Sequence, residues 1–233
     1  MSEAAVPAAI QLIEERDGDG MLLQRCSMRG GVLHGALEQY GPNGQLLVQT
    51  HFEDGKMHGP MSAYANDGKL VQKSQFRAGL AHGLMEVYVN GRCVSRQNMQ
   101  GGVASGPSLS YDEAGNLTAR LQLSEGQIHG PAEFYHQGQL VRQARYQGGL
   151  LDGESTDFDN EGSVVQRCIY RANLLHGPMR RYWPDGTLME ETHYRDGKLV
   201  GAPARFDAKG RRTGNAESTP ALLDRLQKLV RGV

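Results

Sequence analysis

Residues 58–81 read HGPMSAYANDGKLVQKSQFRAGLA, and the following pair, His82 and Gly83, begins the same pattern again. The glycine of the His-Gly pair recurs along the chain at steps of 23 or 24 residues. A fixed period of this length is typical of a tandem array in which one small unit is stacked repeatedly. Each unit then contacts mainly its neighbours, so the chain of 233 residues is predicted to form one array.

Four series of residues mark the units. The first-series glycine, which usually follows histidine, stands at Gly35, Gly59, Gly83, Gly106, Gly130, Gly153, Gly177 and Gly201. A turn glycine lies 15 residues before the next first-series glycine, at Gly20, Gly44, Gly68, Gly91, Gly115, Gly138, Gly162 and Gly186, and again at Gly210. An aromatic ring follows five residues after each first-series glycine, at Tyr40, Tyr64, Tyr88, Tyr111, Tyr135, Phe158, Tyr182 and Phe206. A strand-end glycine comes eleven residues past the turn glycine, at positions 31, 55, 79, 102, 126, 149 and 197, with Asn173 in the remaining unit.

Each unit has the pattern of a β-hairpin. Residues 40–46 and 64–70 place Asn-Gly or Asp-Gly between apolar residues, which is a strong hairpin signal. After the turn, apolar residues alternate with polar ones, as in residues 46–52, which indicates a strand with one face inward. The spacing between first-series and turn glycine is 8 or 9 residues, so the register of the two strands stays open, because a bulge would reverse the faces.

The predicted fold is all-β: an elongated single-layer antiparallel sheet of about eight tandem hairpins with a C-terminal capping helix. Residues 1–16 are predicted to be an N-terminal cap segment, 17–215 the hairpin array and 216–233 an amphipathic capping helix. The helix would begin at Ser218-Thr219-Pro220, where an N-cap residue precedes proline. A membrane-surface helix is the less favoured alternative, because it would need more length and aromatic residues.

Charge and cysteine content restrict the function classes. The formal net charge is −1 and the pI is near 6.7, so the chain has no general attraction to nucleic acid or anionic membranes. The first residues lack the basic start of a secretory signal, and a cytoplasmic protein is expected. Cys26, Cys93 and Cys168 have no CxxC spacing and are predicted to be small packed thiols.

No catalytic or metal-binding motif stands out. One slot holds His34, His58, His82, His129 and His176, but Ser105 and Asp152 interrupt the row and no thiolates or carboxylates accompany it. We expect these imidazoles to bond to the backbone of a neighbouring loop. The acidic residues 157–161 imitate the start of a calcium loop, but its twelfth position is Cys168 instead of glutamate. The chain is therefore predicted not to be an enzyme and to need neither cofactor nor metal.

A polar stripe is the remaining candidate for a binding surface. Side chains at the same phase of each repeat line up in a regular sheet, and two such slots past the turn glycine carry many long donors. The predicted partner-binding residues are Arg25, Lys73, Arg96, Arg120, Arg145 and Arg167. A basic-leaning stripe of this kind suits an acidic protein partner. The alternative, a solvated face that only keeps the sheet soluble, has equal support at this point.

The unit [Leu/Met]-His-Gly-Pro-x-x-x-Tyr-x-x-Asp-Gly-x-Leu, continued to Tyr-x-x-Gly, resembles the MORN repeat. It is closest to the shortened variant of the bacterial family labelled YwqK-like antitoxins, and the resemblance covers about residues 17–210. It implies a sheet of sequential hairpins and a cytoplasmic antitoxin or immunity protein that neutralises a toxic effector encoded nearby. The alternative from the same resemblance is a membrane-associated scaffold that binds anionic phospholipid headgroups. The scarcity of aromatic pairs beyond Tyr182-Trp183 makes this alternative less favoured. Neither the oligomeric state nor the identity of the partner follows from the sequence.

Overall fold

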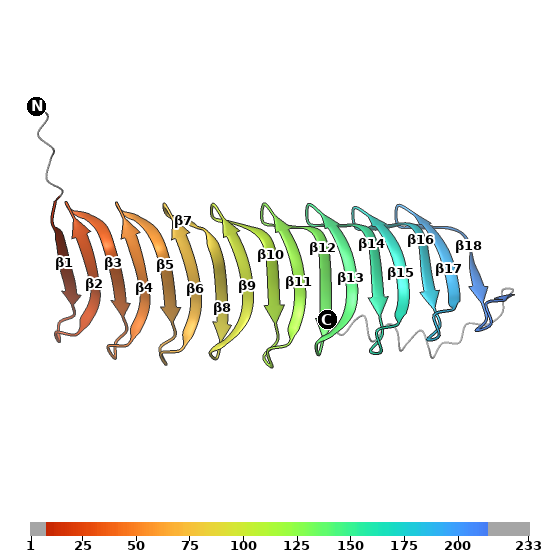
Figure 1. The fold of residues 1–233 in the computed structure, drawn as a ribbon, viewed down its shortest axis with the longest axis horizontal. Helices are drawn as coiled ribbons and strands as arrows, with labels where there is room; N and C mark the ends of the chain where they lie inside the picture. The colour runs from red at the N-terminus through yellow and green to blue at the C-terminus, as the bar shows by residue number, and fades with distance from the viewer. Residues whose placement is uncertain (1–7, 214–233) are drawn as a thin grey trace, which may run out of the picture. The chain divides into compact units, whose positions relative to one another are not determined.

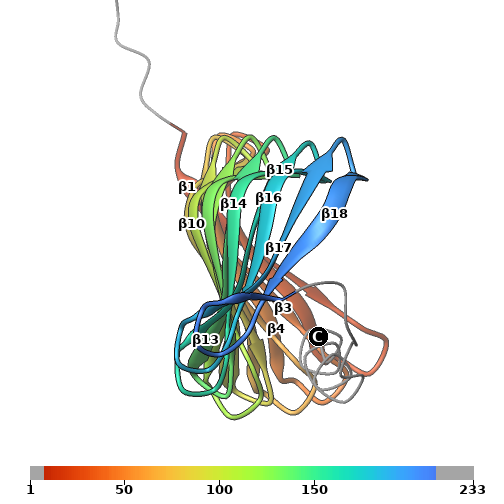
Figure 2. The same cartoon turned by 90° about the vertical axis from the view of Figure 1, so that its right-hand side faces the viewer.

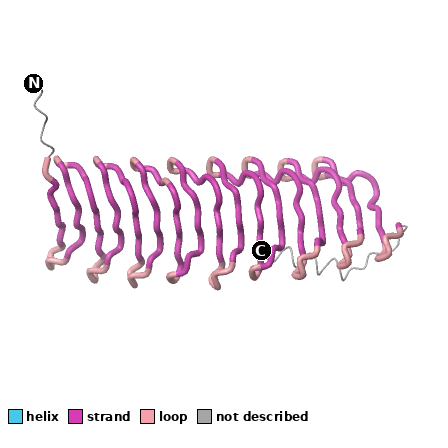
Figure 3. Tube along the Cα trace, viewed as in Figure 1, coloured by secondary structure: helices cyan, strands magenta, loops and turns pink. Residues whose placement is uncertain are grey.

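A computed structural model describes residues 8–213. These residues form strands and turns, and no membrane-crossing helix was found among them (Figure 3). Contacts divide the chain into two units, of which the described parts are residues 8–153 and 154–213. Strand β14 (Leu150–Phe158) includes residues of both units.

The first unit contains thirteen strands that follow one another in chain order (Figure 1). Consecutive strands pair antiparallel, except that β8 pairs with β6, as the short β7 does before it. Viewed along the row in Figure 2, successive strands of this unit are rotated relative to one another, as in any twisted sheet. Their bounds are β1 Ile10–Arg16, β2 Leu22–Arg29, β3 Val32–Tyr40, β4 Leu46–Glu53, β5 Lys56–Tyr64, β6 Leu70–Arg77, β7 Leu80–Ala81, β8 Gly83–Val89, β9 Arg92–Gln100, β10 Val103–Tyr111, β11 Leu117–Ser124, β12 Gln127–His136 and β13 Gln139–Gln147.

The second unit repeats the same arrangement. Consecutive strands from β15 to β19 pair antiparallel. Their bounds are β15 Val164–Arg171, β16 Leu174–Tyr182, β17 Leu188–Arg195, β18 Lys198–Phe206 and β19 Arg212–Thr213. In both units the substantial contacts of a strand are with its neighbours in the sheet, so neither sheet closes on itself. The predicted antiparallel hairpin array is thus confirmed within each unit.

The strand-end glycines lie in two-residue turns. At residues 54–55 both φ angles are positive, 49° and 78°, which is the conformation of a type I′ hairpin turn. Asn173 takes the glycine position in its own turn with φ 67°. A type I′ turn matches the twist of the strands it joins, so these turns connect one hairpin to the next without splaying the sheet.

The turn glycines lie in loops of two kinds, and these account for the two spacings. In the longer loops only the glycine has positive φ; the Gly44 amide bonds to the Gly41 carbonyl at 2.9 Å, and the Gly41 amide bonds to the Gln45 carbonyl at 2.8 Å. In the two shorter loops Asn90-Gly91 and Gln137-Gly138 both have positive φ at each residue. The register is nevertheless the same in both kinds, because the ring residue pairs with the leucine-slot residue across a bulge: Tyr40 with Leu46, and Tyr88 with Cys93. This settles the register that the sequence left open.

The His-Gly-Pro segment is a bulge in the first strand of each hairpin. Between β4 and β5, Thr50 pairs with Met61 and Phe52 with Met57, so that three residues of β5 oppose one residue of β4. The first-series glycine inside each bulge has positive φ, 88° at Gly59 and 107° at Gly35. Bulges bend a strand and increase its twist, so this motif sets the curvature of the sheet.

The packed part of the sheet is a row of small side chains on one face. Within residues 8–213, no large side chain is fully buried, as expected when no second layer covers the sheet. The smallest exposures are those of Ala132 at 1%, Cys168 at 2%, and Thr50, Ser74 and Ser155, each at 3%. Longer side chains two residues away on the same strand, such as Val48 and Phe52 beside Thr50, flank this row.

The sequence predicted a capping segment at each end of the array. The predicted capping helix, residues 216–233, lies outside the described residues. Within the predicted N-terminal cap segment, residues 10–16 form β1, which pairs with β2 from Ile10↔Arg29 onward. Both Ile10 and Leu12 on this strand are more than half exposed.

Candidate functional site

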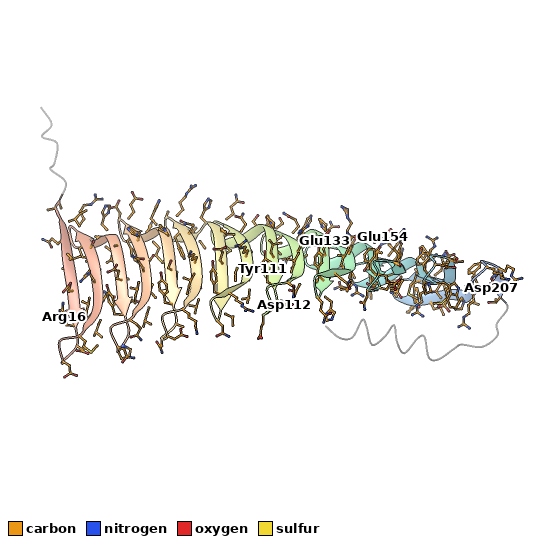
Figure 4. All side chains as sticks on the ribbon, turned by 60° about the horizontal axis from the view of Figure 1, so that its bottom comes forward. Arg16, Tyr111, Asp112, Glu133, Glu154 and Asp207 are labelled. Carbon is orange, nitrogen blue, oxygen red and sulfur yellow. The ribbon has the colours of Figure 1, made fainter. Side chains whose placement is uncertain are left out.

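The face opposite the packed row carries a charged row that crosses the strands. Its members are directly opposite one another in the register, strand after strand. In the first unit the charged row runs Glu14, Arg25, Glu38, Gln49, Ser62, Lys73, Glu86, Arg96, Leu109, Arg120, Glu133 and Gln143. Side chains stand out from the ribbon along the first unit, among them Glu133 of this row (Figure 4).

The carboxylates of this row are fixed by hydrogen bonds from two directions. The Tyr88 hydroxyl donates to Glu86 Oε2 at 2.9 Å, while Arg96 Nε lies 2.8 Å from Glu86 Oε1. Burial raises the pKa of Tyr88, and the hydrogen bond to Glu86 raises that pKa further. The result is a triad of tyrosine, glutamate and arginine that draws on two strands.

Two further triads have the same composition. Around Glu133, the Tyr135 hydroxyl donates at 2.7 Å and Arg120 Nη1 donates at 3.3 Å, both to Oε2. Burial raises the pKa of Tyr135, and the hydrogen bond to Glu133 adds to that effect.

The triad nearest the N-terminus is linked to the edge strand. The Tyr40 hydroxyl donates to Glu38 Oε2 at 2.7 Å, and Arg25 Nη1 lies 3.8 Å from the same atom. Arg25 also donates from Nε to Glu14 Oε1 at 3.0 Å. The hydrogen bond to Glu38 raises the pKa of Tyr40, and the bonds to Arg16 and Arg25 lower the pKa of the Glu14 carboxyl. Three triads of the same composition therefore occur along the first unit, and the contact between arginine and glutamate is longest in the one at Arg25.

The predicted partner-binding residues divide into two groups. Arg25, Arg96 and Arg120 belong to the triads. Among the described residues no ion pair involves the other three, which are Lys73, Arg145 and Arg167. Arg145 lies outside the charged row, opposite Pro131. Whether any of these residues contacts a partner remains a prediction.

The expected basic character of the stripe is wrong for the charged row of the first unit. The row contains four cations and four carboxylates, so that it carries no net charge, and the two signs alternate except where Arg96 and Arg120 follow one another across Leu109. The sequence prediction took the cations from the second strand of each hairpin, whereas the acids come from the first strand. A signal did exist: the slot three residues after the first-series glycine holds Glu38, Glu86 and Glu133.

The aromatic series forms a second row on the same face. Tyr40, Tyr88 and Tyr135 stand two residues after the triad glutamates, and successive even-spaced residues of a strand share a face. Every ring of the series from Tyr40 to Phe206 is half-buried, so part of each ring faces solvent. The face therefore presents tyrosine rings and arginine side chains side by side.

Three histidines of the His-Gly slot, His34, His129 and His176, link their bulge to the next turn. The Asp54 amide donates to His34 Nδ1 at 3.3 Å, and the Gly148 amide donates to His129 Nδ1 at 3.4 Å. The predicted bond from imidazole to loop backbone is confirmed for these two. At two others a carboxylate is the neighbour: His58 Nδ1 lies 3.1 Å from Glu53 Oε2, and His176 Nδ1 lies 3.1 Å from Asp196 Oδ1.

The acidic stretch that imitates a calcium loop forms a turn, which the side chain of Asp159 stabilises by hydrogen bonds. Asp159 Oδ1 accepts hydrogen bonds from the amides of Glu161 at 2.9 Å and Ser163 at 2.8 Å. Asp112 makes the same kind of turn, where hydrogen bonds from the side chain and the amide of Asn116 lower the pKa of its carboxyl. Within residues 8–213, no three His, Cys, Asp or Glu side chains are grouped to hold a metal ion.

The three cysteines are free thiols, as predicted. Cys26 and Cys168 are buried in the packed row, and Cys93 is half-buried with its Sγ 3.4 Å from the Ser95 carbonyl oxygen.

Comparison with known proteins identifies the repeat. Residues 33–54 and 175–196 match the family model described as MORN repeat variant. Each match covers one hairpin, β3 with β4 and β16 with β17. No curated protein matches the chain. A solved structure entitled "Crystal Structure of TcdB2-TccC3" aligns with 84% of this chain at 14% identity and a TM-score of 0.24, and this chain spans 14% of that one. A likeness of this size carries no information about function.

Proposed function

We propose that this chain, which carries MORN-type repeats, is a non-catalytic binding protein that holds another protein against the face with the charged row and the tyrosine row. The repeat architecture supports this role, because a stacked array provides an extended surface that a partner can follow. In the first unit that surface is regular over its thirteen strands.

The observation that carries the proposal is the repeated triad of tyrosine, glutamate and arginine. Tyrosine and arginine are the residue types over-represented at the energetic centres of protein interfaces. Here the Glu86 carboxylate holds both the Tyr88 hydroxyl and the Arg96 guanidinium before any partner arrives. Side chains that are already ordered lose less conformational entropy on binding, so a partner gains more of the contact energy.

We further propose that the partner is a toxic effector and that the chain is a cytoplasmic antitoxin or immunity protein. This step is supported by the resemblance of the repeat unit to the YwqK-like antitoxin family. Neutralisation would then require only that the partner's active surface is covered. No chemical step by this chain is involved.

The test is coexpression of the full chain with each product of the genes adjacent to its own. We expect one product to form a stable complex with the chain and to be toxic in its absence. If no adjacent product binds and none is toxic, the antitoxin assignment is wrong. A partner that binds but is not toxic would support the binding role and contradict the antitoxin role.

The contribution of the triads can be measured with a charge-swapped pair. Glu86→Arg combined with Arg96→Glu keeps an ion pair between the two strands but reverses the pattern that a partner meets. We expect partner binding to weaken by about tenfold or more, because opposed like charges are costly at an interface. Lys56→Glu, at an exposed residue at the start of β5 and outside the row, is the matched control. Equal binding by the swapped variant would exclude the triads from the interface.

A further inference from the structure

The second unit contains a cavity between two of its turns. It has a volume of about 380 Å³ and is lined by Ser163 and Val164 after one turn, by Arg167 on β15, and by Tyr182, Pro184, Asp185 and Gly186 at the next turn. Arg167 on β15 and the three lining residues 184–186 are exposed, so the cavity opens to solvent. We call it the Arg167 notch.

Arg167 differs from the arginines of the triads in its cross-strand neighbour. The residue directly opposite Arg167 on β16 is Arg180, whereas in a triad a glutamate lies opposite the arginine. Arg180 Nε lies 2.6 Å from Glu191 Oε2 on β17, which raises the pKa of Arg180. No acidic side chain within residues 154–213 forms an ion pair with Arg167.

This arrangement is unfavourable in the chain by itself. Like charges directly opposite each other on a sheet destabilise it, and Glu191 can compensate only one of the two guanidinium groups fully. The other three repeats that carry a row arginine in the first unit place a glutamate beside it. An exposed arginine without its acid, at the edge of a cavity, has its donors available for an external anion.

The walls of the notch restrict the kind of anion. The Tyr182 ring, Val164 and Pro184 supply apolar surface, and the Ser163 hydroxyl supplies a hydrogen-bonding group. Asp185 also lines the notch, and the hydrogen bond from the Thr187 amide to its Oδ1, 2.9 Å long, lowers the pKa of its carboxyl. A charged Asp185 disfavours ligands with several negative charges. A single carboxylate on a short apolar stem fits these conditions best.

We propose that the Arg167 notch receives the carboxylate of one aspartate or glutamate side chain of a partner protein, with the guanidinium of Arg167 as its ligand. The inference rests on the proposed protein-binding function and adds a specific contact to it. The planar guanidinium matches a carboxylate in two parallel hydrogen bonds, which sets orientation as well as charge. The partner's neighbouring residues are expected to be neutral or basic, because Asp185 stands at the notch.

A small probe tests the notch without the partner. The full chain, labelled with ¹⁵N, is titrated with N-acetyl-glutamate N-methylamide while the Arg167 Nε–Hε signal is followed by NMR. We expect that signal to shift on titration with the glutamate probe and not with N-acetyl-glutamine N-methylamide, which has the same shape without the charge. Inorganic phosphate is the third ligand and is expected to bind more weakly, because of Asp185.

Variants separate this contact from general charge effects. Arg167→Gln should weaken probe binding by about tenfold, the loss expected for one charge-assisted hydrogen bond. Because that variant also relieves the repulsion with Arg180, it should fold at least as well as the parent chain. Arg167→Lys, which keeps the charge without the fork, should bind at an intermediate level. Arg171→Gln, an exposed arginine on the same strand, should bind as the parent does.

The outcomes distinguish this inference from the proposed function. Three results would show that the notch is not a carboxylate site. They are equal shifts with the glutamine analogue, tighter binding of phosphate than of the glutamate probe, and unchanged probe binding by Arg167→Gln. A protein partner captured equally by the parent chain and by Arg167→Gln would overturn this inference as well and leave the binding function intact. Probe binding at Arg167 together with failure of every coexpressed partner would support the notch and count against the protein-binding function.

Discussion

The Tyr88 hydroxyl donates a hydrogen bond to the carboxylate of Glu86, two residues before it on β8. The same relationship joins Tyr40 to Glu38 and Tyr135 to Glu133. In the two intervening repeats the glutamate position holds Ser62 and Leu109, and among the described residues the ring hydroxyls of those repeats donate no such bond. The first unit therefore contains matched tyrosines with and without a carboxylate partner.

These matched tyrosines give the first prediction. Tyr88→Phe should lower the free energy of unfolding by about 1 kcal/mol, the usual net value of one part-buried hydrogen bond. Tyr64→Phe removes a hydroxyl that makes no hydrogen bond within residues 8–213. This variant should change the free energy of unfolding by less than about 0.5 kcal/mol. Urea unfolding of both variants measures the difference. Equal losses would mean that the Glu86 bond contributes nothing net.

Alkaline pH should act through the same hydroxyl groups. The pKa values of Tyr40, Tyr88 and Tyr135 are raised in the folded chain by burial and by the bonds to their glutamates. A raised pKa means that the folded state holds the proton more tightly, so the stabilisation is complete below the ordinary tyrosine pKa near 10. It should be lost as pH rises through the higher folded values. Absorbance titration of tyrosinate should show a group of residues that ionises late. That group should disappear in the triple variant Tyr40→Phe, Tyr88→Phe and Tyr135→Phe.

The first-series glycines offer a test of crowding at the bulge. A Cβ added at Gly35 would lie 2.9 Å from Ser27 Cβ, whereas a Cβ at Gly59 would lie 3.9 Å from His51 Cβ. Both positions have positive φ, so Gly→Ala at either should cost on the order of 1–2 kcal/mol in backbone strain. Gly35→Ala should cost more, because the backbone must shift to relieve the contact. Thermal unfolding of the two variants makes the comparison, and a larger loss at Gly59 would show that the bulge at Gly35 relaxes freely.

The hairpins, and the alternation of the strand after each turn, could be predicted because each repeat carries its own signals. Glycine at 44, 55 and 59 marks two turns and a bulge, and alternation marks the inward residues. The detailed turn types were less predictable. Asn-Gly and Asp-Gly are favoured for type I′ turns, yet residues 43–44 lie in a longer loop with positive φ only at the glycine. The turn at 78–79 instead places Ala78 in the left-handed region, where alanine has no intrinsic preference.

The charged row was only half predictable for a related reason. The cations at the slot of Arg96 were visible as a periodic series, but their opposite residues depend on the register. Each hairpin contains two bulges, one at the ring residue and one at His-Gly-Pro, and each changes which residues face one another. Without that register, Glu86 could not be placed beside Arg96. The sequence therefore indicated a basic stripe where the structure has a row with equal numbers of cations and carboxylates.

The charge balance of this row gives the last prediction, which concerns membranes. A basic stripe would attract anionic lipid headgroups by about 1 kcal/mol per cation, but the charged row of the first unit offers them four cations and four carboxylates. We expect the full chain not to sediment with vesicles containing 30% phosphatidylserine at physiological salt. The triple variant Glu38→Gln, Glu86→Gln and Glu133→Gln should sediment measurably more, because it removes three carboxylates from the row while keeping the shape of the side chains. Arg96 and Arg120 then lose their ion pairs, whereas Arg25 keeps its pair with Glu14. Salt-sensitive sedimentation of the parent chain, at a level equal to that of the variant, would show that lipid binding does not depend on this row and would favour the scaffold role.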